Sequence, residues 1–154
     1  MKSQQSASYE RVWLITGSSS GLGRALTEAI LSRGERAIVT ARTPEQVRDL
    51  IERYPAQALV LELDVTRQDQ VRSVVREAIE RFGHIDVLVN NDGPSEELAQ
   101  EVAPLAPKVV TIQPGSSNGH PSDHAAALAE RIIAKVDADR VKINNPLTLK
   151  EGKR

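Results

Sequence analysis

Short apolar runs alternate along the chain with longer segments in which apolar residues recur at helical spacing. The runs are rich in Val, Ile and Leu and end at turn-forming residues, which is typical of strands buried on both faces of a parallel sheet. Strands are predicted at residues 12–16, 37–41, 58–65, 85–90 and 108–113, and residues 141–144 are a candidate sixth strand at the edge of the sheet.

Amphipathic helices are predicted in the intervals between these strands. A helix over residues 44–54 is expected to start with proline, with Thr43 as its N-cap and Gln46 completing a capping box. Ser95 is expected to cap a later helix, and Gly83 to end the helix before the fourth strand. Each predicted strand is therefore followed by a predicted helix.

This alternation predicts an α/β fold class. Short connections between strands and helices imply right-handed crossovers, and hence a doubly wound, mostly parallel, Rossmann-like sheet with helices on both faces. The 154 residues suit a single domain. Residues 1–10 are expected to form a polar N-terminal tail, and residues 150–154 to be frayed.

Composition narrows the class of ligand. The formal charge is −1, from 20 basic and 21 acidic residues spread along the chain, so neither nucleic acid nor an anionic membrane is an expected partner. The chain has no cysteine, which excludes disulfides and thiolate metal sites and fits a reducing compartment. No signal peptide or membrane span is expected from the polar first ten residues. We therefore expect a cytoplasmic protein with a small-molecule ligand.

A glycine-rich turn joins the first strand to the first helix. It consists of Thr16-Gly17-Ser18-Ser19-Ser20-Gly21-Leu22-Gly23. In such a turn one glycine permits the tight bend, one the close approach of a phosphate, and one the packing of the helix. Unpaired N–H groups and the helix dipole then favour a bound diphosphate. The predicted dinucleotide-binding residues of this turn are Gly17, Ser19, Ser20, Gly21, Leu22 and Gly23.

The end of the second strand indicates which dinucleotide is bound. Many NAD-binding folds place an acidic residue there against the adenosine ribose, whereas this chain has Ala41 and Arg42. Because a guanidinium suits a 2′-phosphate, NADP(H) is the predicted cofactor. The alternative is that Arg42 is a solvated loop residue.

Two other types of site match parts of the sequence. The glycine turn also matches the G-x-S-x-G nucleophile elbow, followed by Asp86 or Asp92 and then His120 or His124 in the order of α/β-hydrolases. A hydrolase is disfavoured because its oxyanion donors would have to come from an earlier strand, which the chain before residue 12 does not supply. The two histidines lack a convincing third ligand, so no metal site is predicted.

Four motifs, in this order, resemble those of the short-chain dehydrogenase/reductase family. They are the glycine turn, Asp64-Val65, Asn90-Asn91-Asp92-Gly93 and Pro114-Gly115. The resemblance implies that Asp64 and Val65 contact the adenine and that Asn90 lies along the adenosine side of the cofactor. It also implies that Pro114 and Gly115 lie near the nicotinamide.

The chain departs from the family pattern at the catalytic residues. Asp92 replaces the alanine of Asn-Asn-Ala-Gly, and the family's catalytic Tyr-x-x-x-Lys is absent. The two tyrosines, Tyr9 and Tyr54, have Trp13 and Ala58 four residues later. In the family, the tyrosine is the acid or base at the substrate oxygen, while the lysine lowers its pKa and holds the nicotinamide ribose. The catalytic residues of this chain are therefore unknown.

Residues 95–105 resemble the family's helix that follows the Tyr-Lys pair, so the chain resembles a shortened or engineered relative. The leading hypothesis is an NADP(H)-binding Rossmann domain with little or no oxidoreductase activity. A second is an NADP-dependent oxidoreductase with a non-standard acid, such as Ser116, Ser117 or His120. A third is a minimal scaffold that binds no nucleotide. The substrate and the oligomeric state stay open.

Overall fold

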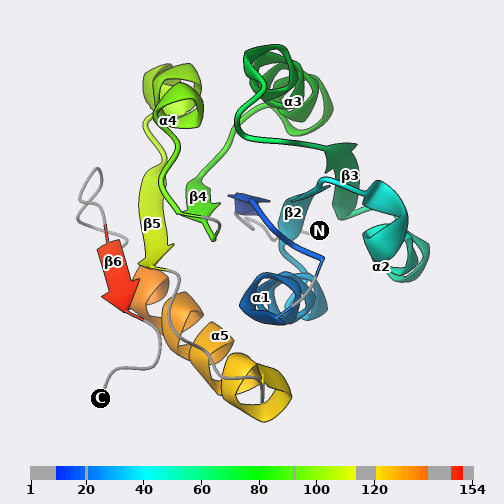
Figure 1. Cartoon of the computed structure of the whole chain (residues 1–154). Coiled ribbons are helices and arrows are strands. Elements are labelled where there is room, and N and C mark those ends of the chain that lie inside the picture. The colour runs from blue at the N-terminus through cyan, green and yellow to red at the C-terminus, as the bar shows by residue number, and fades with distance from the viewer. Residues whose placement is uncertain (1–9, 20, 92, 114–120, 139–146, 151–154) are drawn as a thin grey trace, which may run out of the picture.

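Six parallel strands form one sheet in a computed structural model that describes residues 10–19, 21–91, 93–113, 121–138 and 147–150 (Figure 1). The strands are β1 (Val12–Ile15), β2 (Arg36–Ala41), β3 (Ala58–Glu62), β4 (Val87–Asn90), β5 (Lys108–Gln113) and β6 (Leu147–Lys150). Their order is β3-β2-β1-β4-β5-β6, so the chain winds outward from β1 in both directions. This order confirms the predicted doubly wound, Rossmann-like fold.

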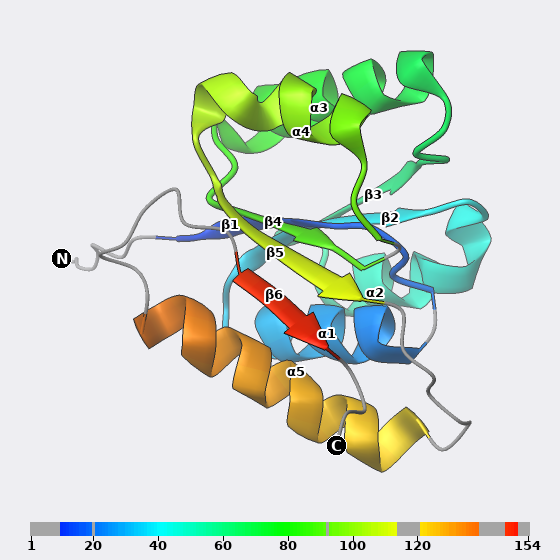
Figure 2. The same ribbon diagram turned by 60° about the vertical axis from the view of Figure 1, so that its left-hand side comes forward.

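Helices cover both faces of this sheet, as predicted. They are α1 (Gly21–Ser32), the 3₁₀ turn η1 (Pro44–Val47), α2 (Arg48–Arg53), α3 (Gln68–Phe82), α4 (Glu96–Val102), the 3₁₀ turn η2 (Ala103–Leu105) and α5 (Pro121–Ala138). The helices α1 and α5 pack side by side on one face, while α3 and α4 lie on the other (Figure 2). Among the described helices, none has the length and apolar content needed to cross a bilayer.

The core consists of two apolar layers separated by the sheet. Side chains of a strand alternate between its two faces, so Trp13 and Ile15 pack toward α1 and α5, whereas Val12 and Leu14 pack toward α3. All four residues of β1 have no exposed surface. The central strand β1 is therefore packed on both faces, and its carboxyl end leads into the glycine turn.

The predicted capping box at Thr43 is wrong. The Thr43 side chain makes no capping hydrogen bond, because the Gln46 N–H that it would cap donates to the Thr43 carbonyl at 3.0 Å. This main-chain bond forms the 3₁₀ turn η1 before α2, in place of one continuous helix over residues 44–54. By contrast, the predicted cap at Ser95 is confirmed, since its Oγ accepts from the Leu98 N–H at 3.2 Å.

The ends of several elements differ from the prediction. β3 stops at Glu62 rather than residue 65, because the chain turns at Asp64, whose N–H donates to the Gln70 side chain at 2.7 Å. The candidate strand at residues 141–144 lies outside the described residues, and the observed edge strand is β6. Lys150 was expected in a frayed end, but it ends β6 and is paired there with Gln113 of β5. Residues 1–9 and 151–154 lie outside the described residues.

Candidate functional site

The predicted binding residues lie at the carboxyl edge of the sheet. Gly17 follows β1, Arg42 follows β2, Asp64 follows β3 and Asn90 ends β4. All these strands are parallel, so their carboxyl ends meet at one edge. The strand order reverses between β1 and β4, which is where doubly wound sheets bind their ligands.

The glycine turn leads from β1 into the first turn of α1. Gly17 and Gly21 have φ angles of 67° and 60°, a conformation that glycine adopts without steric cost. The turn is held to β2, because the N–H of the buried Ser18 donates to the Thr40 carbonyl at 3.0 Å. Beside Gly21 a Cβ would meet no atom within 4 Å. A side chain at Gly21 would therefore meet no neighbour among the described residues, and the start of a helix is the end that suits an anionic group.

Gly23 packs against the turn so closely that no side chain fits. An added Cβ would lie 2.0 Å from the carbonyl oxygen of Gly17 and 2.7 Å from the side-chain nitrogen of Asn91. Leu22, one residue earlier, turns its side chain into the core between the sheet and α1. Only main-chain groups of Leu22 and Gly23 are therefore suited to contact a ligand at this edge.

Asn91 is a site residue for which the sequence predicted no contact. Its side-chain Nδ2 donates to the Gly17 carbonyl at 3.0 Å, and its backbone N–H donates to the Thr16 hydroxyl at 2.9 Å. The Thr16 N–H in turn donates to the Val89 carbonyl at 3.1 Å. Asn91 thus ties the end of β4 to the glycine turn. Asn91 belongs to the Asn90-Asn91-Asp92-Gly93 motif and directly follows a buried strand, and these two features of the sequence could have indicated this role.

Asn90 has a buried side chain that reaches toward β5. Its Nδ2 donates to the Thr111 hydroxyl at 3.4 Å, and only 3% of the residue is exposed. The amide oxygen has no hydrogen-bond partner among the described residues. The side chain therefore lies between β4 and β5, and its contact with the adenosine side of a cofactor stays a prediction.

Arg42 and Asp64 form the polar group beyond β2 and β3. Asp64 Oδ1 accepts from the Thr66 hydroxyl at 2.6 Å and from its N–H at 3.0 Å. These hydrogen bonds are the main reason that the pKa of the Asp64 carboxyl is lowered, and the charges of Arg42 and Arg67 lower it further. Arg42 is exposed, and the described residues supply no ion-pair partner to its guanidinium. The Arg42 guanidinium could therefore bind an anionic ligand without breaking an ion pair with a described residue.

The remaining predicted residues are either partly buried or outside the described residues. Val65 is partly buried against the apolar layer beneath α3, and Ser19 is partly buried in the glycine turn. Ser20, Asp92, Pro114, Gly115, Ser116, Ser117 and His120 lie outside the described residues. Tyr54 follows α2 and leads into the start of β3, at the opposite edge of the sheet from the glycine turn.

The ends of β4 and β5 bring neutral polar groups to this edge. Asn90 and Asn91 carry amides, and Thr111 carries a hydroxyl. None of these side chains exchanges a proton near neutral pH. These three side chains can therefore form hydrogen bonds, but none of them can act as an acid or a base.

Curated proteins similar to this chain include one named as an oxidoreductase. It is 44% identical over 92 residues to Oxidoreductase BOA17 of Botryotinia fuckeliana, a match that covers 59% of this chain and 34% of that protein. The chain spans about a third of the length of the curated relatives it matches.

Solved structures share the same fold. A short-chain dehydrogenase from Streptomyces avermitilis is 28% identical with a TM-score of 0.65, over 92% of this chain and 64% of that one. A metagenomic short-chain oxidoreductase in complex with NADP is 20% identical with a TM-score of 0.67, over 94% and 83%. A short chain dehydrogenase/reductase from Burkholderia phymatum in complex with NAD is 18% identical with a TM-score of 0.62, over 92% and 64%.

The family match covers the site itself. Residues 11–108 match the short chain dehydrogenase family, and this range contains the glycine turn, Arg42, Asp64 and the end of β4. Because this match covers more than half of the chain and solved short-chain dehydrogenases share its fold, the chain belongs to the short chain dehydrogenase family.

Proposed function

We propose that this chain binds NADP(H) at the carboxyl edge of the sheet. The diphosphate would lie at the start of α1, beside the open position at Gly21, and the 2′-phosphate would meet Arg42. The observation that carries the proposal is the exposed Arg42 guanidinium, which has no ion-pair partner among the described residues and lies one strand away from the glycine turn.

Family membership leaves the choice between the two dinucleotides open, because solved relatives carry NADP in one case and NAD in another. The residue after β2 favours NADP(H). A guanidinium offers a planar pair of donors to phosphate oxygens, and such charge-assisted bonds are stronger than neutral ones.

We further propose that the chain has little or no oxidoreductase activity. A bound NADPH supplies a hydride, and reduction of a carbonyl also needs a proton at the carbonyl oxygen. The sequence has no Tyr-x-x-x-Lys, and Tyr54 lies at the other edge of the sheet. The described side chains at the ends of β4 and β5 are neutral amides and a hydroxyl.

Titration of NADPH and NADH into the protein and into the variant Arg42→Ala tests cofactor choice. We expect the variant to lose NADPH affinity by about tenfold or more, the loss typical of a charge-assisted contact, while NADH affinity stays unchanged. The matched control is Arg48→Ala, which removes another exposed arginine from the start of α2. If neither dinucleotide binds the wild-type protein, the nucleotide-free scaffold is the correct function.

A turnover assay tests the second part of the proposal. NADPH oxidation is followed with a panel of small ketones and aldehydes, and no rate above the uncatalysed background is expected. Turnover at about 1 per second or faster, within the ordinary enzymatic range, would contradict the proposal. It would favour an oxidoreductase with a non-standard acid, provided that Gly21→Val abolished the turnover.

A further inference from the structure

Arg24 links the first helix to the segment that follows Arg42. It lies in the first turn of α1, and its side chain is 26% exposed. Its Nη1 donates to the carbonyl of Gln46 in η1 at 3.2 Å, and its Nη2 donates to the carboxylate of Asp49 in α2. Its Nε contacts Glu28, one turn along α1, at 3.2 Å. One guanidinium therefore fastens the start of α1 to both η1 and α2.

The backbone around Arg42 is held on both sides. Before it, the Ala41 carbonyl accepts from the Leu63 N–H at 3.0 Å. After it, the Thr43 carbonyl accepts from the Gln46 N–H at 3.0 Å. The carbonyl of that same Gln46 is the acceptor for Arg24. Arg42 therefore lies in the short segment that joins β2 to η1, and Arg24 fixes η1 to α1.

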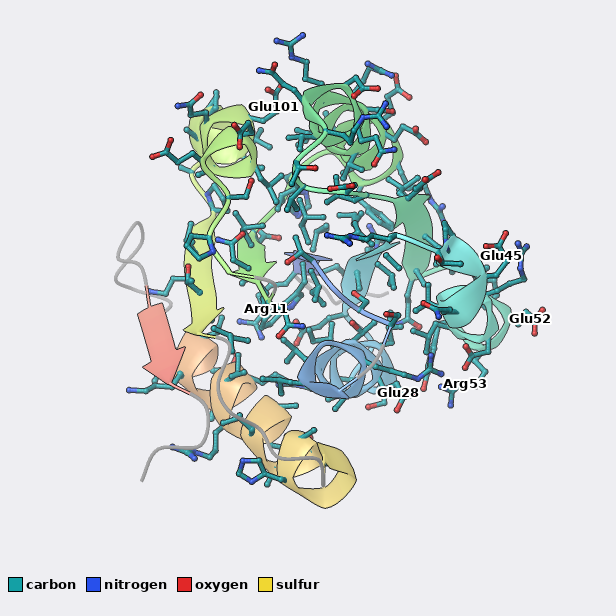
Figure 3. All side chains as sticks on the ribbon, viewed as in Figure 1. Arg11, Glu28, Glu45, Glu52, Arg53 and Glu101 are labelled. Atoms are coloured by element: carbon teal, nitrogen blue, oxygen red, sulfur yellow. The ribbon has the colours of Figure 1, made fainter. Side chains whose placement is uncertain are left out.

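The charges around Arg24 favour this arrangement. The hydrogen bond to Asp49 is the largest cause of the raised pKa of Arg24, and the same bond is the largest cause of the lowered pKa of Asp49. Arg53 joins the group through Glu28 at 3.3 Å and Asp49 at 4.0 Å, and Figure 3 shows Arg53 and Glu28 lying between α2 and α1. Of these two arginines, Arg24 is the one that contacts a backbone group of η1.

We propose that Arg24 is a positioning residue that sets the preference for NADP(H) over NAD(H). It acts through Arg42, because its own donors are used by Gln46, Asp49 and Glu28. By fixing η1 against α1, it holds the Arg42 backbone at a set place relative to the glycine turn. A binding group held in place before the ligand arrives loses less conformational freedom on binding. This inference rests on the proposed 2′-phosphate contact of Arg42.

Three variants separate positioning from simple charge. Arg24→Gln removes the charge and the bonds to η1 and α2, whereas Arg24→Lys keeps the charge but cannot contact Gln46 and Asp49 together. Arg53→Gln is the matched control, because it removes one guanidinium from the same cluster without touching Gln46. NADH binding reports whether each variant retains a folded diphosphate site.

Dissociation constants for NADPH and NADH are measured for each variant at one ionic strength. Both Arg24 variants are expected to weaken NADPH binding about tenfold and NADH binding less than about twofold, while Arg53→Gln changes neither by more than about twofold. Wild-type affinity in Arg24→Lys, or equal losses for both dinucleotides in Arg24→Gln, would overturn the positioning role alone. A wild-type protein that shows no preference for NADPH would overturn the proposed function and this inference with it.

Discussion

Replacing Gly23 with alanine is expected to destabilise the protein, although it lies in a helix. Alanine in place of a helical glycine ordinarily stabilises by about 1 kcal/mol. Here the new Cβ would lie 2.0 Å from the Gly17 carbonyl oxygen, whereas carbon and oxygen in ordinary contact are about 3.3–3.6 Å apart. The glycine turn or the start of α1 must therefore move by more than about 1 Å.

Three contributions to the free energy of unfolding determine the size of this effect. Overpacking of this kind costs about 1–3 kcal/mol. Movement of the Gly17 carbonyl also breaks its hydrogen bond from Asn91, which is worth about 1 kcal/mol. After the gain in helix propensity is subtracted, a net loss of about 1–3 kcal/mol in the free energy of unfolding is expected.

Urea unfolding of Gly23→Ala, followed by circular dichroism, measures this loss. The matched control is Ser32→Ala at the exposed end of the same helix, where a change within about 0.5 kcal/mol is expected. A Gly23→Ala protein as stable as the wild type, or more stable, would refute the claim that the turn and helix are packed too tightly for a side chain.

Two further predictions concern the polar groups of the site. Asn91→Ala should weaken NADPH and NADH binding by the same factor, because it loosens the shared glycine turn; a change in their ratio, measured by titration, would contradict this role. Asp64 has a lowered pKa in the folded state, so its contribution to stability is present above its unfolded pKa of about 3.9 and is lost as the pH falls through the folded value. Asp64→Asn should therefore lose less stability than the wild type between about pH 5 and about pH 2, as urea unfolding at each pH would show. If the free energy of unfolding fell equally with pH in both proteins, the Thr66 hydrogen bonds would not be the cause.

The alternation of short apolar runs and amphipathic segments was enough to predict the fold. Five predicted strands are present in the observed sheet, and residues 108–113 agree at both ends with β5. Parallel strands end at one edge, so the prediction also brought Gly17, Arg42 and Asn90 to that edge. These features follow from periodicity and from chain topology, both of which can be read along a sequence.

The predicted capping box at Thr43 and the predicted end of β3 were wrong because two local interactions compete at each of these places. At Thr43 the hydroxyl and the main-chain carbonyl are alternative acceptors for the Gln46 N–H, and the carbonyl makes the bond. At the end of β3, side-chain bonds at Asp64 turn the chain before the apolar pattern ends. Sequence patterns that indicate each interaction separately do not reveal which of the two forms.

The missed site residues act through contacts between distant parts of the chain. Asn91 meets Gly17 across 74 residues, and Arg24 meets Gln46 across 22 residues. Both contacts depend on where β4 and η1 come to lie after folding. Arginine and asparagine are common on protein surfaces, so residue type did not distinguish them, and the motif that contains Asn91 did not indicate its contact with Gly17.

The most direct test of the central claim is calorimetric titration of NADPH and NADH into the wild-type protein beside Arg42→Ala. We expect the wild type to bind NADPH more tightly than NADH and Arg42→Ala to reduce this preference to near unity. Equal affinity of the wild type for both dinucleotides, or an unchanged preference in the variant, would contradict the assignment of the 2′-phosphate to Arg42.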